Sequence, residues 1–462
     1  GSSVNDLVMA VRAGSEKSAG QAERAGRTAI FNNRNLRDGV KVGSGSGAAA
    51  ESPPRTLREA VARVPSSNVA VISVPGHYAA LEAHQALSAG LDVLLFSDNV
   101  PLAAEVELKQ RAHRLGRLIM GPGAGTAMLG GACVGFANVT TPGPVAVVAA
   151  AGTGAQEVMS LLDRWGVGVS HVIGVGGRDL STELGGTMAR SALRLLSADE
   201  RTKVVLLVSK LPSPEVVCRV LRAAGDKPVI GALLGLPDNM DVPDEITLTT
   251  TLEAGVLAVL AMLGRSAPDP TLGLPERVAD ALTTLTEHRR WVRGLFSGGT
   301  LCYESLVILN RHLGPVYSNT PLDKDFGLPA PPSSHICLDL GEEEYTKRRP
   351  HPIIDPQARV ALLREQGSDP EVAVIILNVV LGYGAHDDPA AMLAPVCGEI
   401  TAAGGPVIVV YVLGTQGDPQ GFDIQRQAFT EAGCVVTETA ARASLAAAAI
   451  ASRNPELTQA WL

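Results

Sequence analysis

The sequence has 462 residues, of which 46% are hydrophobic and 3% aromatic, and its formal net charge is −8. An acidic balance without a long basic run argues against nucleic acid and anionic membrane surfaces as partners. Six cysteines lack CxxC or Cys/His ligand spacing, which excludes a disulfide framework and a zinc site. Because no segment has the roughly 18 uninterrupted apolar residues of a membrane span and no signal peptide is visible, we expect a cytoplasmic protein.

The first 65 residues differ in composition from the rest of the chain. Residues 5–11 predict a short strand, and the Gly/Ser-rich residues 43–54 predict a flexible linker. The chain begins at Gly1 without a methionine. We therefore expect residues 1–65 to be an N-terminal remnant and linker, with the native N-terminus missing.

Strands alternate with helices from residue 66 onward in three successive stretches. The first, at 66–140, predicts strands at 69–74, 92–96 and 118–120 and helices at 76–90 and 101–115. The second, at 141–264, predicts strands at 145–150, 169–176, 203–208 and 227–234 and helices at 155–166, 184–197 and 214–224. The third, at 334–462, predicts strands at 335–340, 372–378, 406–413 and 434–438.

Such alternation is typical of parallel sheets with right-handed crossovers. We therefore predict an α/β protein with tandem Rossmann-like and flavodoxin-like parallel-sheet units. The second and third units share one architecture, which is compatible with an internal duplication. Between them, residues 265–333 lack this alternation and predict a connector with a helix at 274–293.

Two glycine-rich turns of the second unit are candidate ligand sites. Gly152, Thr153 and Gly154 join the strand at 145–150 to a helix, where a phosphate or carboxylate binds in open α/β sheets. Gly176 and Gly177 follow the next strand, beside Arg178, which pairs well with carboxylate or phosphate. Tight turns that need glycine for their geometry, with Arg178 in a surface ion pair, are the alternative. A third glycine-rich stretch, at 121–131, precedes no helix and at most lines a site.

A fourth candidate is the turn Ser297-Gly298-Gly299-Thr300, which enters a helix that carries Cys302. Backbone N–H groups in such a turn hold anions. A helix N-terminus also favours a thiolate, but no histidine close to Cys302 offers itself as a base. We therefore interpret the turn as an anion cradle and Cys302 as a packing residue.

A fifth candidate lies after the strand at 372–378. Asn378 ends this strand, and His386 lies in the glycine-rich loop that follows, so both side chains are candidates to face a substrate. An ordinary helix-entry loop, capped by an aspartate before Pro389, is the alternative.

The order of these units resembles the NDP-forming acyl-CoA synthetases, including succinyl-CoA synthetase. The similar stretches are VVAAAGTGAQEVMSLLDRWGVGVSHVIGVGG, KPVIGALLG and DPEVAVIILNVVLGYGAHDDPA, within a resemblance over about residues 66–462. The synthetases carry a relay histidine soon after the strand that KPVIGALLG matches. Here the segment that follows, LPDNMDVPDEITLTTTLEAG, has no histidine, and no nucleotide-grasp domain is apparent. Synthetase activity is therefore not expected of this chain alone.

With SGGTLC between the two ligase-like units and no relay histidine, the chain resembles the FdrA family. That resemblance implies a component of oxamate carbamoyltransferase in purine (allantoin) degradation, working with two companion proteins. The enzyme interconverts oxamate plus carbamoyl phosphate with oxalurate plus phosphate. The resemblance also implies a cytoplasmic oligomer.

Carbamoyl transfer needs a phosphate cradle, stabilisation of an oxyanion and a clamp for the acceptor carboxylate. It requires no metal, cofactor or covalent nucleophile. We expect Arg178, Gly299 and Thr300 to act in catalysis, and the other glycine-rich turn residues, with Ser297, Asn378 and His386, to bind substrate. Two alternatives stay open. One is a CoA-dependent acyl transferase or ligase that binds CoA through residues 73–79 and 97–99, and the other is a non-catalytic scaffold.

Overall fold

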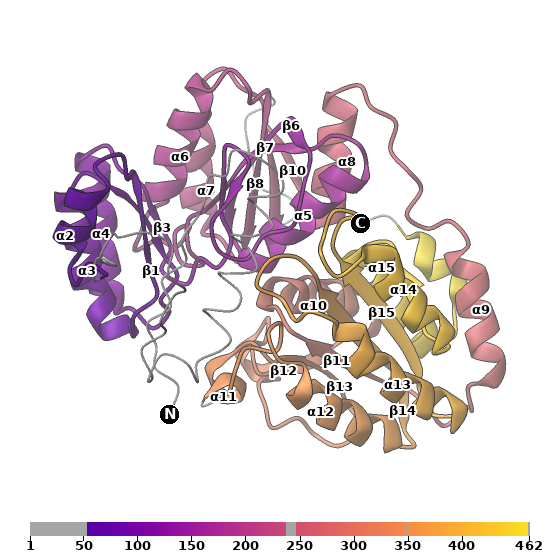
Figure 1. The fold of residues 1–462 in the computed structure, drawn as a ribbon. Helices are drawn as coiled ribbons and strands as arrows, with labels where there is room; N and C mark the ends of the chain where they lie inside the picture. Colours follow the sequence, from indigo (N-terminus) through magenta and orange to yellow (C-terminus); the bar gives the residue numbers. More distant parts are fainter. Residues whose placement is uncertain (1–52, 237–245, 348, 461–462) are drawn as a thin grey trace, which may run out of the picture.

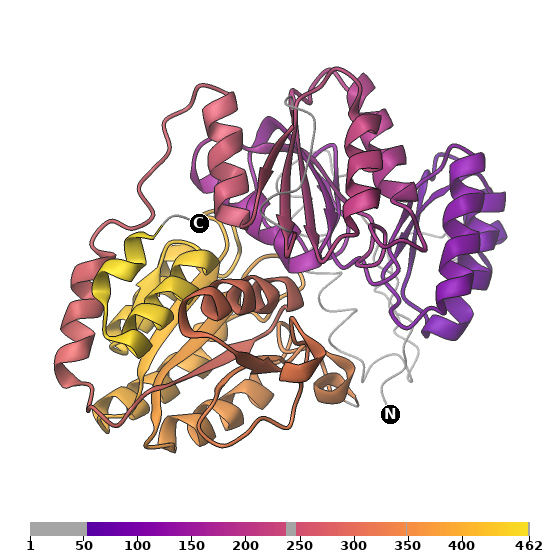
Figure 2. The same ribbon diagram turned by 180° about the vertical axis from the view of Figure 1, so that it is seen from behind.

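The computed structural model describes residues 53–236, 246–347 and 349–460, and the strand and most of the linker expected within residues 1–65 lie outside them. Three sheets follow one another along the chain (Figures 1 and 2). Nearly all strand pairs are parallel, which confirms the predicted α/β class. Among the described residues, no helix is long and apolar enough to cross a membrane.

The first unit is a small sheet of three parallel strands in the order β1-β2-β3. Its helix at residues 102–114 packs against the second unit, where Lys109 forms a buried ion pair with Asp179 at 2.9 Å. One continuous hydrophobic core joins this sheet to the second unit. The elements are α2 (Leu57–Arg63), β1 (Val69–Ile72), α3 (Gly76–Ser88), β2 (Asp92–Leu95), α4 (Leu102–Arg114) and β3 (Ile119–Met120).

The second unit is a seven-stranded sheet in the order β10-β9-β8-β6-β7-β4-β5. Its five main strands are parallel, and the hairpin β4–β5 adds an antiparallel edge made from residues of the glycine-rich stretch 121–131 and those just after it. The elements are β4 (Met128–Leu129), β5 (Ala132–Cys133), β6 (Pro142–Ala150), α5 (Gly152–Arg164), β7 (Val169–Gly174), α6 (Thr187–Ala198), β8 (Val204–Lys210), α7 (Pro214–Leu221), η1 (Arg222–Ala224), β9 (Val229–Leu234), β10 (Thr247–Thr249) and α8 (Leu252–Met262).

The third unit is a six-stranded parallel sheet in the order β12-β13-β11-β14-β15-β16. Its elements, with the preceding helix α9, are α9 (Leu274–Thr284), β11 (Trp291–Phe296), α10 (Gly299–Leu313), β12 (Val316–Ser318), η2 (Lys324–Phe326), β13 (His335–Asp339), α11 (Glu343–Thr346), α12 (Gln357–Ser368), β14 (Val372–Val380), α13 (Pro389–Ala402), β15 (Val407–Leu413), α14 (Phe422–Glu431), β16 (Val435–Thr437), α15 (Ala440–Ser452) and η3 (Pro455–Gln459).

The region predicted as a connector contains the central strand of this third sheet. The helix predicted at 274–293 ends at Thr284, and residues 291–296 form strand β11. Strand β11 pairs with β13 on one side and β14 on the other. The Ser-Gly-Gly-Thr turn therefore opens the first βα crossover of the third unit and does not lie between two units.

The second and third units repeat one topology, as the sequence indicated. In the second unit, β7 and β8 flank the central strand β6, and β9 and β10 continue outward from β8. In the third unit, β13 and β14 flank the central strand β11, and β15 and β16 continue outward from β14. The last helix of each unit, α8 or α15, follows the edge strand β10 or β16. Each central strand leads into a helix that begins Gly-Thr and has a glutamate five residues after the glycine: Glu157 in α5 and Glu304 in α10. This repetition places two similar helix N-termini in equivalent positions.

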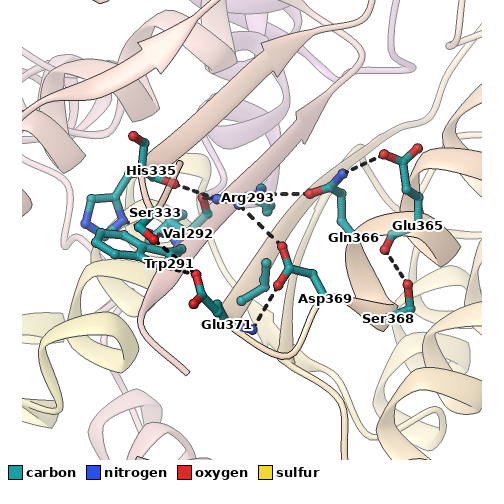
Figure 3. Close-up of polar contacts among 12 residues, drawn as sticks. Trp291, Val292, Arg293, Ser333, His335, Glu365, Gln366, Ser368, Asp369 and Glu371 are labelled. Atoms are coloured by element: carbon teal, nitrogen blue, oxygen red, sulfur yellow. Dashed lines mark hydrogen bonds and ion pairs between the residues drawn. The ribbon is translucent and has the colours of Figure 1, made fainter. Parts of the chain in front are cut away.

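Polar side chains fix strand β11 to the neighbouring elements (Figure 3). Arg293 donates from Nε to Gln366 Oε1 at 2.8 Å and from a guanidinium nitrogen to the Ser334 carbonyl at 2.7 Å. Asp369 Oδ2 lies 3.6 Å from the same guanidinium. His335 Nδ1 accepts the Val292 N–H at 3.1 Å, and burial lowers the pKa of His335 to about 4, so its ring is neutral at pH 7. These contacts position the strand that carries the candidate turn.

Candidate functional site

Helices α5 and α10 begin beside one another where the second and third units meet (Figures 1 and 2). Their N-cap residues are Ala151 and Gly298, and neither helix has a side-chain cap. The first intrahelical bonds come from Ala155 N to Ala151 O and from Cys302 N to Gly298 O. The earlier N–H groups of both helices have no intrahelical acceptor, so both ends carry partial positive charge.

Two pairs of residues bring these helix ends into contact. A Cβ atom at Gly298 would lie 2.6 Å from Thr153 Oγ1, and one at Gly154 would lie 2.8 Å from Thr300 Cγ2. Each threonine of a Gly-Thr start thus packs on a glycine of the other helix. We call the region formed by residues 152–154 and 297–300, with Lys210 and Asp339, the paired-helix site.

Lys210 and Asp339 enter this site from the ends of strands β8 and β13. A Cβ atom at Gly299 would lie 2.9 Å from Lys210 Nζ and would collide with Asp339 Oδ2. A larger residue at position 299 would displace the ends of one or both of these side chains from the start of α10. Among the described residues, Lys210 Nζ has neither a hydrogen-bond acceptor nor an ion-pair partner.

The carboxyl group of Asp339 is almost fully buried. Burial raises its pKa to about 6, against the opposing effects of the Gly341 N–H and the Lys210 ammonium. Oδ1 accepts the Gly341 N–H at 2.9 Å, and Asn319 bonds both backbone groups of Asp339 at 2.9 Å. The carboxyl group is thus held in one position, with Oδ2 toward Gly299.

The sequence analysis did not identify Lys210 or Asp339. Both lie at the carboxyl ends of parallel strands, the edge where open α/β sheets bind ligands; Asp339 follows Leu338, and Lys210 follows Ser209. Attention to the first charged residue after each buried apolar run would have found them. The sequence does not reveal how the second and third units pack together, and this packing brings the end of β8 in one sheet close to the start of α10 in the other unit.

Asn378 holds the turn at Ser297. Its Oδ1 accepts the Ser297 N–H at 2.8 Å, and its Nδ2 donates to Ser297 Oγ at 3.2 Å, with both residues buried. Arg359 in turn donates to the carbonyls of Leu295 and Asn378 at 3.0 and 2.6 Å. These hydrogen bonds fix the position of the turn that precedes α10.

Arg178 contacts residues of the first unit. Its guanidinium forms an ion pair with Glu105 at 2.7 Å and donates to the Val100 carbonyl at 2.7 Å. A Cβ atom at Gly176 would lie 2.8 Å from the Gly121 carbonyl carbon, so this turn packs on another loop. One at Gly177 would lie 4.0 Å from the Ala150 carbonyl oxygen, close to the start of α5. The cation at the paired-helix site is Lys210.

His386 lies in the loop between β14 and α13 of the third unit, and this loop also contacts the second unit. Its Nδ1 accepts the Asp388 N–H at 3.0 Å, and its backbone N–H donates to the Ile353 carbonyl at 2.9 Å. Nearby, Tyr383 N donates to the Ala137 carbonyl at 2.8 Å. Asp388 caps helix α13, which matches the helix-entry alternative for this loop.

Cys302 is fully buried in the core shared by the second and third units. Burial raises the pKa of its thiol well above the usual value. A thiol in that state is a poor nucleophile. The structure therefore confirms Cys302 as a packing residue.

Buried polar contacts around the paired-helix site lock the two units together in a repeated pattern. Glu304 of α10 accepts the Leu252 N–H at the start of α8 at 2.7 Å. Its counterpart Glu157 accepts the Ala440 N–H at the start of α15 at 3.3 Å. Burial raises the pKa of Glu304 to about 8 and that of Glu157 to about 7. Each half thus caps a helix of the other.

The loops considered for CoA binding lie at the carboxyl ends of β1 and β2. Helix α3 begins at Gly76 without a side-chain cap, and a Cβ atom at Gly76 would lie 2.7 Å from the Asn99 carbonyl oxygen. The two loops are therefore in close contact. Among the described residues, no group of three or more His, Cys, Asp or Glu side chains is arranged to hold a metal ion.

Comparison with known proteins relates part of this chain to CoA ligases. The CoA-ligase family matches residues 295–450, from strand β11 to helix α15. The chain is 40% identical over 423 residues to the uncharacterized protein YahF of Escherichia coli K12, covering 88% of this chain and 81% of YahF. The chain belongs to the family of YahF.

A more distant relative is the succinate–CoA ligase [ADP-forming] subunit alpha 2 of Archaeoglobus fulgidus, 31% identical over 187 residues. That match spans 39% of this chain and 63% of the subunit. Among solved structures, the dinucleotide-forming acetyl-coenzyme A synthetase 1 of Ca. Korarchaeum cryptofilum, in complex with phosphate and ADP, is 14% identical with a TM-score of 0.31. The structural match covers 90% of this chain and 89% of the synthetase chain.

Proposed function

We propose that this chain binds carbamoyl phosphate at the paired-helix site and, as a subunit of a carbamoyltransferase, transfers the carbamoyl group to oxamate. The observation that carries the proposal is the meeting of two uncapped helix N-termini beside the Lys210 ammonium. The products are oxalurate and phosphate, and the setting is purine (allantoin) degradation in the cytoplasm. We also propose that the chain works together with companion subunits of this carbamoyltransferase.

The charges of the site support an anionic ligand. Each helix N-terminus acts as roughly half a positive charge, so the pair and Lys210 together offer about two charges to a phosphate group. The Asp339 carboxylate offsets part of this charge when it is ionised. A hydrogen bond between an ammonium and a phosphate contributes about 1.5–3 kcal/mol.

The missing relay histidine favours direct transfer over a phosphoenzyme route. In the synthetases that the chain resembles, phosphate passes through that histidine. No histidine occurs between β9 and α8 here. A phosphate cradle without a phosphate acceptor suits a reaction in which phosphate leaves as the product, as it does from carbamoyl phosphate.

A CoA-dependent acyl transferase or ligase is the second candidate. It is favoured by the relatives named as succinate–CoA ligase alpha subunits and by the uncapped start of α3 at the end of β1. Calorimetry with CoA separates the two candidates. Micromolar affinity for CoA, lost when Gly76 is replaced by valine, would count against carbamoyl transfer.

Phosphate release from carbamoyl phosphate tests the proposal. We expect release that depends on oxamate, measured with the chain alone and with the proteins that copurify with it. Lys210→Gln should weaken the binding of inorganic phosphate by about 10–100-fold. Lys203→Gln is a matched control, because Lys203 is exposed and directly precedes Val204, the first residue of strand β8, whereas Lys210 is the last residue of that strand. No oxamate-dependent release in any combination would refute the proposal, and a Lys210 variant with full activity would refute the assigned site.

A further inference from the structure

The paired-helix site is asymmetric although it is built from repeated units. At the start of α10, Lys210 and Asp339 both reach the position of a side chain at Gly299. At the start of α5, a Cβ atom at Gly152 would meet nothing within 4 Å. One helix end is therefore crowded by two charged side chains, and the other is open.

The carboxylate's part in this asymmetry comes from one position of the repeated topology. Asp339 pairs with Phe296, which lies three residues before the start of α10. In the second unit, Gly174 pairs with Ala149, which lies three residues before the start of α5. Glycine thus occupies the position that is aspartate in the third unit, so only one half supplies a carboxylate to the site.

Carbamoyl transfer to oxamate needs a proton acceptor. The acceptor nitrogen forms a bond to the carbamoyl carbon, and the bond from that carbon to the phosphate oxygen breaks with its electron pair on the phosphate. The nitrogen must also lose one of its two protons. An amide nitrogen is a weak nucleophile, so a nearby base accelerates this step, typically by about 10²–10⁴-fold.

We infer that Asp339 Oδ2 accepts the proton of the attacking acceptor nitrogen while Lys210 and the open start of α5 hold the phosphate. This inference rests on the proposed carbamoyl transfer. Oδ1 is occupied by the Gly341 N–H, so Oδ2 is the atom that faces the site. The proton then passes to the departing phosphate, which leaves Asp339 ionised for the next turnover.

The surroundings of Asp339 suit a base that works near neutral pH. Its pKa of about 6 lies just below physiological pH, so the group is mostly ionised and still basic. The charged or titratable groups that face it are Lys210 from β8, Glu342 and His351 from the segment after β13, and Cys302 from α10. Burial lowers the pKa of His351 to about 4, so His351 is neutral in this range.

Asp339→Asn tests the inference, because asparagine keeps the shape and the acceptor for the Gly341 N–H. We expect oxalurate formation to fall about 10²–10⁴-fold, while the affinity for inorganic phosphate stays equal or becomes tighter. The rise of kcat with pH through about pH 6 should disappear in the variant. Glu342→Gln, which removes an exposed carboxylate three residues away, should change kcat less than about threefold.

The outcomes separate this inference from the proposed function. Wild-type protein that forms oxalurate, with an Asp339→Asn variant of similar kcat and the same pH profile, would overturn only the role of Asp339. Wild-type protein that forms no oxalurate would overturn the function and the role together. Should Asp339→Asn not fold, Asp339→Glu is the second variant. Its displaced carboxylate should lower kcat while phosphate binding remains, and unchanged kcat would count against the role.

Discussion

Gly299→Ala is the substitution that perturbs the paired-helix site most narrowly. It adds one methyl group at the start of α10 and leaves every backbone N–H in place. The methyl group would lie 2.9 Å from Lys210 Nζ and collide with the Asp339 carboxylate. Gly152→Ala is the matched control for folding stability, since Gly152 starts the equivalent helix α5 and its added methyl group meets no protein atom within 4 Å.

The magnitudes follow from packing and chain entropy. Inserting a methyl group where there is no space costs about 1–3 kcal/mol. Replacing glycine by alanine where the backbone allows it stabilises by about 0.4–1 kcal/mol. We therefore expect Gly299→Ala to lower the free energy of unfolding by roughly 0.5–2 kcal/mol and Gly152→Ala to raise it slightly. Displacement of Lys210 should also weaken phosphate binding by about 10–100-fold in Gly299→Ala.

Urea denaturation measures the first effect, and calorimetric titration with inorganic phosphate measures the second. The two variants need to be compared under the same ionic strength, because salt screens the charges involved. Equal phosphate affinity in wild type and Gly299→Ala, within about twofold, would refute the assignment of Lys210 and Gly299 to one anion site. Equal losses of unfolding free energy in Gly299→Ala and Gly152→Ala would show that the loss of stability is not local to α10.

Three further results are expected. Glu253→Gln should lower the free energy of unfolding by about 3–5 kcal/mol in urea, because it leaves the buried Arg442 without its carboxylate partner; a loss below 1 kcal/mol would contradict this. The pKa of Glu304 is raised from 4.5 to about 8, so the folded state holds a proton that the unfolded state has lost, and stability should fall as pH rises from about 4.5 to 8. Glu304→Gln should flatten that slope in urea titrations at pH 5, 6, 7 and 8, and an unchanged slope would exclude Glu304 as its source. Cys302→Ala should keep the transfer rate within about threefold, measured as phosphate release, and complete inactivation of a folded variant would restore Cys302 as a nucleophile.

The strands and helices of the three units were largely predictable from the sequence. Strand β15 is an uninterrupted apolar run, and β8 and β14 each begin with one, as expected for parallel strands covered on both faces. Strand β11 was missed because its sequence, Trp-Val-Arg-Gly-Leu-Phe, contains a buried arginine and a glycine. Arg293 is tolerated there because Gln366, Ser334 and Asp369 satisfy its guanidinium (Figure 3).

The candidate site was predictable in part. Glycine-rich turns at the carboxyl ends of central strands identified both helix starts, Gly152–Gly154 and Ser297–Thr300. The contact between them depends on how two sheets pack, and a single sequence holds no direct signal for that. For the same reason Arg178 was the expected cation, while the structure places Lys210 against Gly299 and pairs Arg178 with Glu105.

The most direct test of the account follows the carbamoyl group itself. Carbon-13-labelled carbamoyl phosphate is mixed with oxamate, this chain and the proteins that copurify with it, and the label is followed by NMR. The account predicts that the labelled carbon appears in oxalurate and that Lys210→Gln abolishes this transfer while Lys203→Gln does not. Label that appears only in the spontaneous breakdown products of carbamoyl phosphate, at the same rate with and without protein, would contradict it.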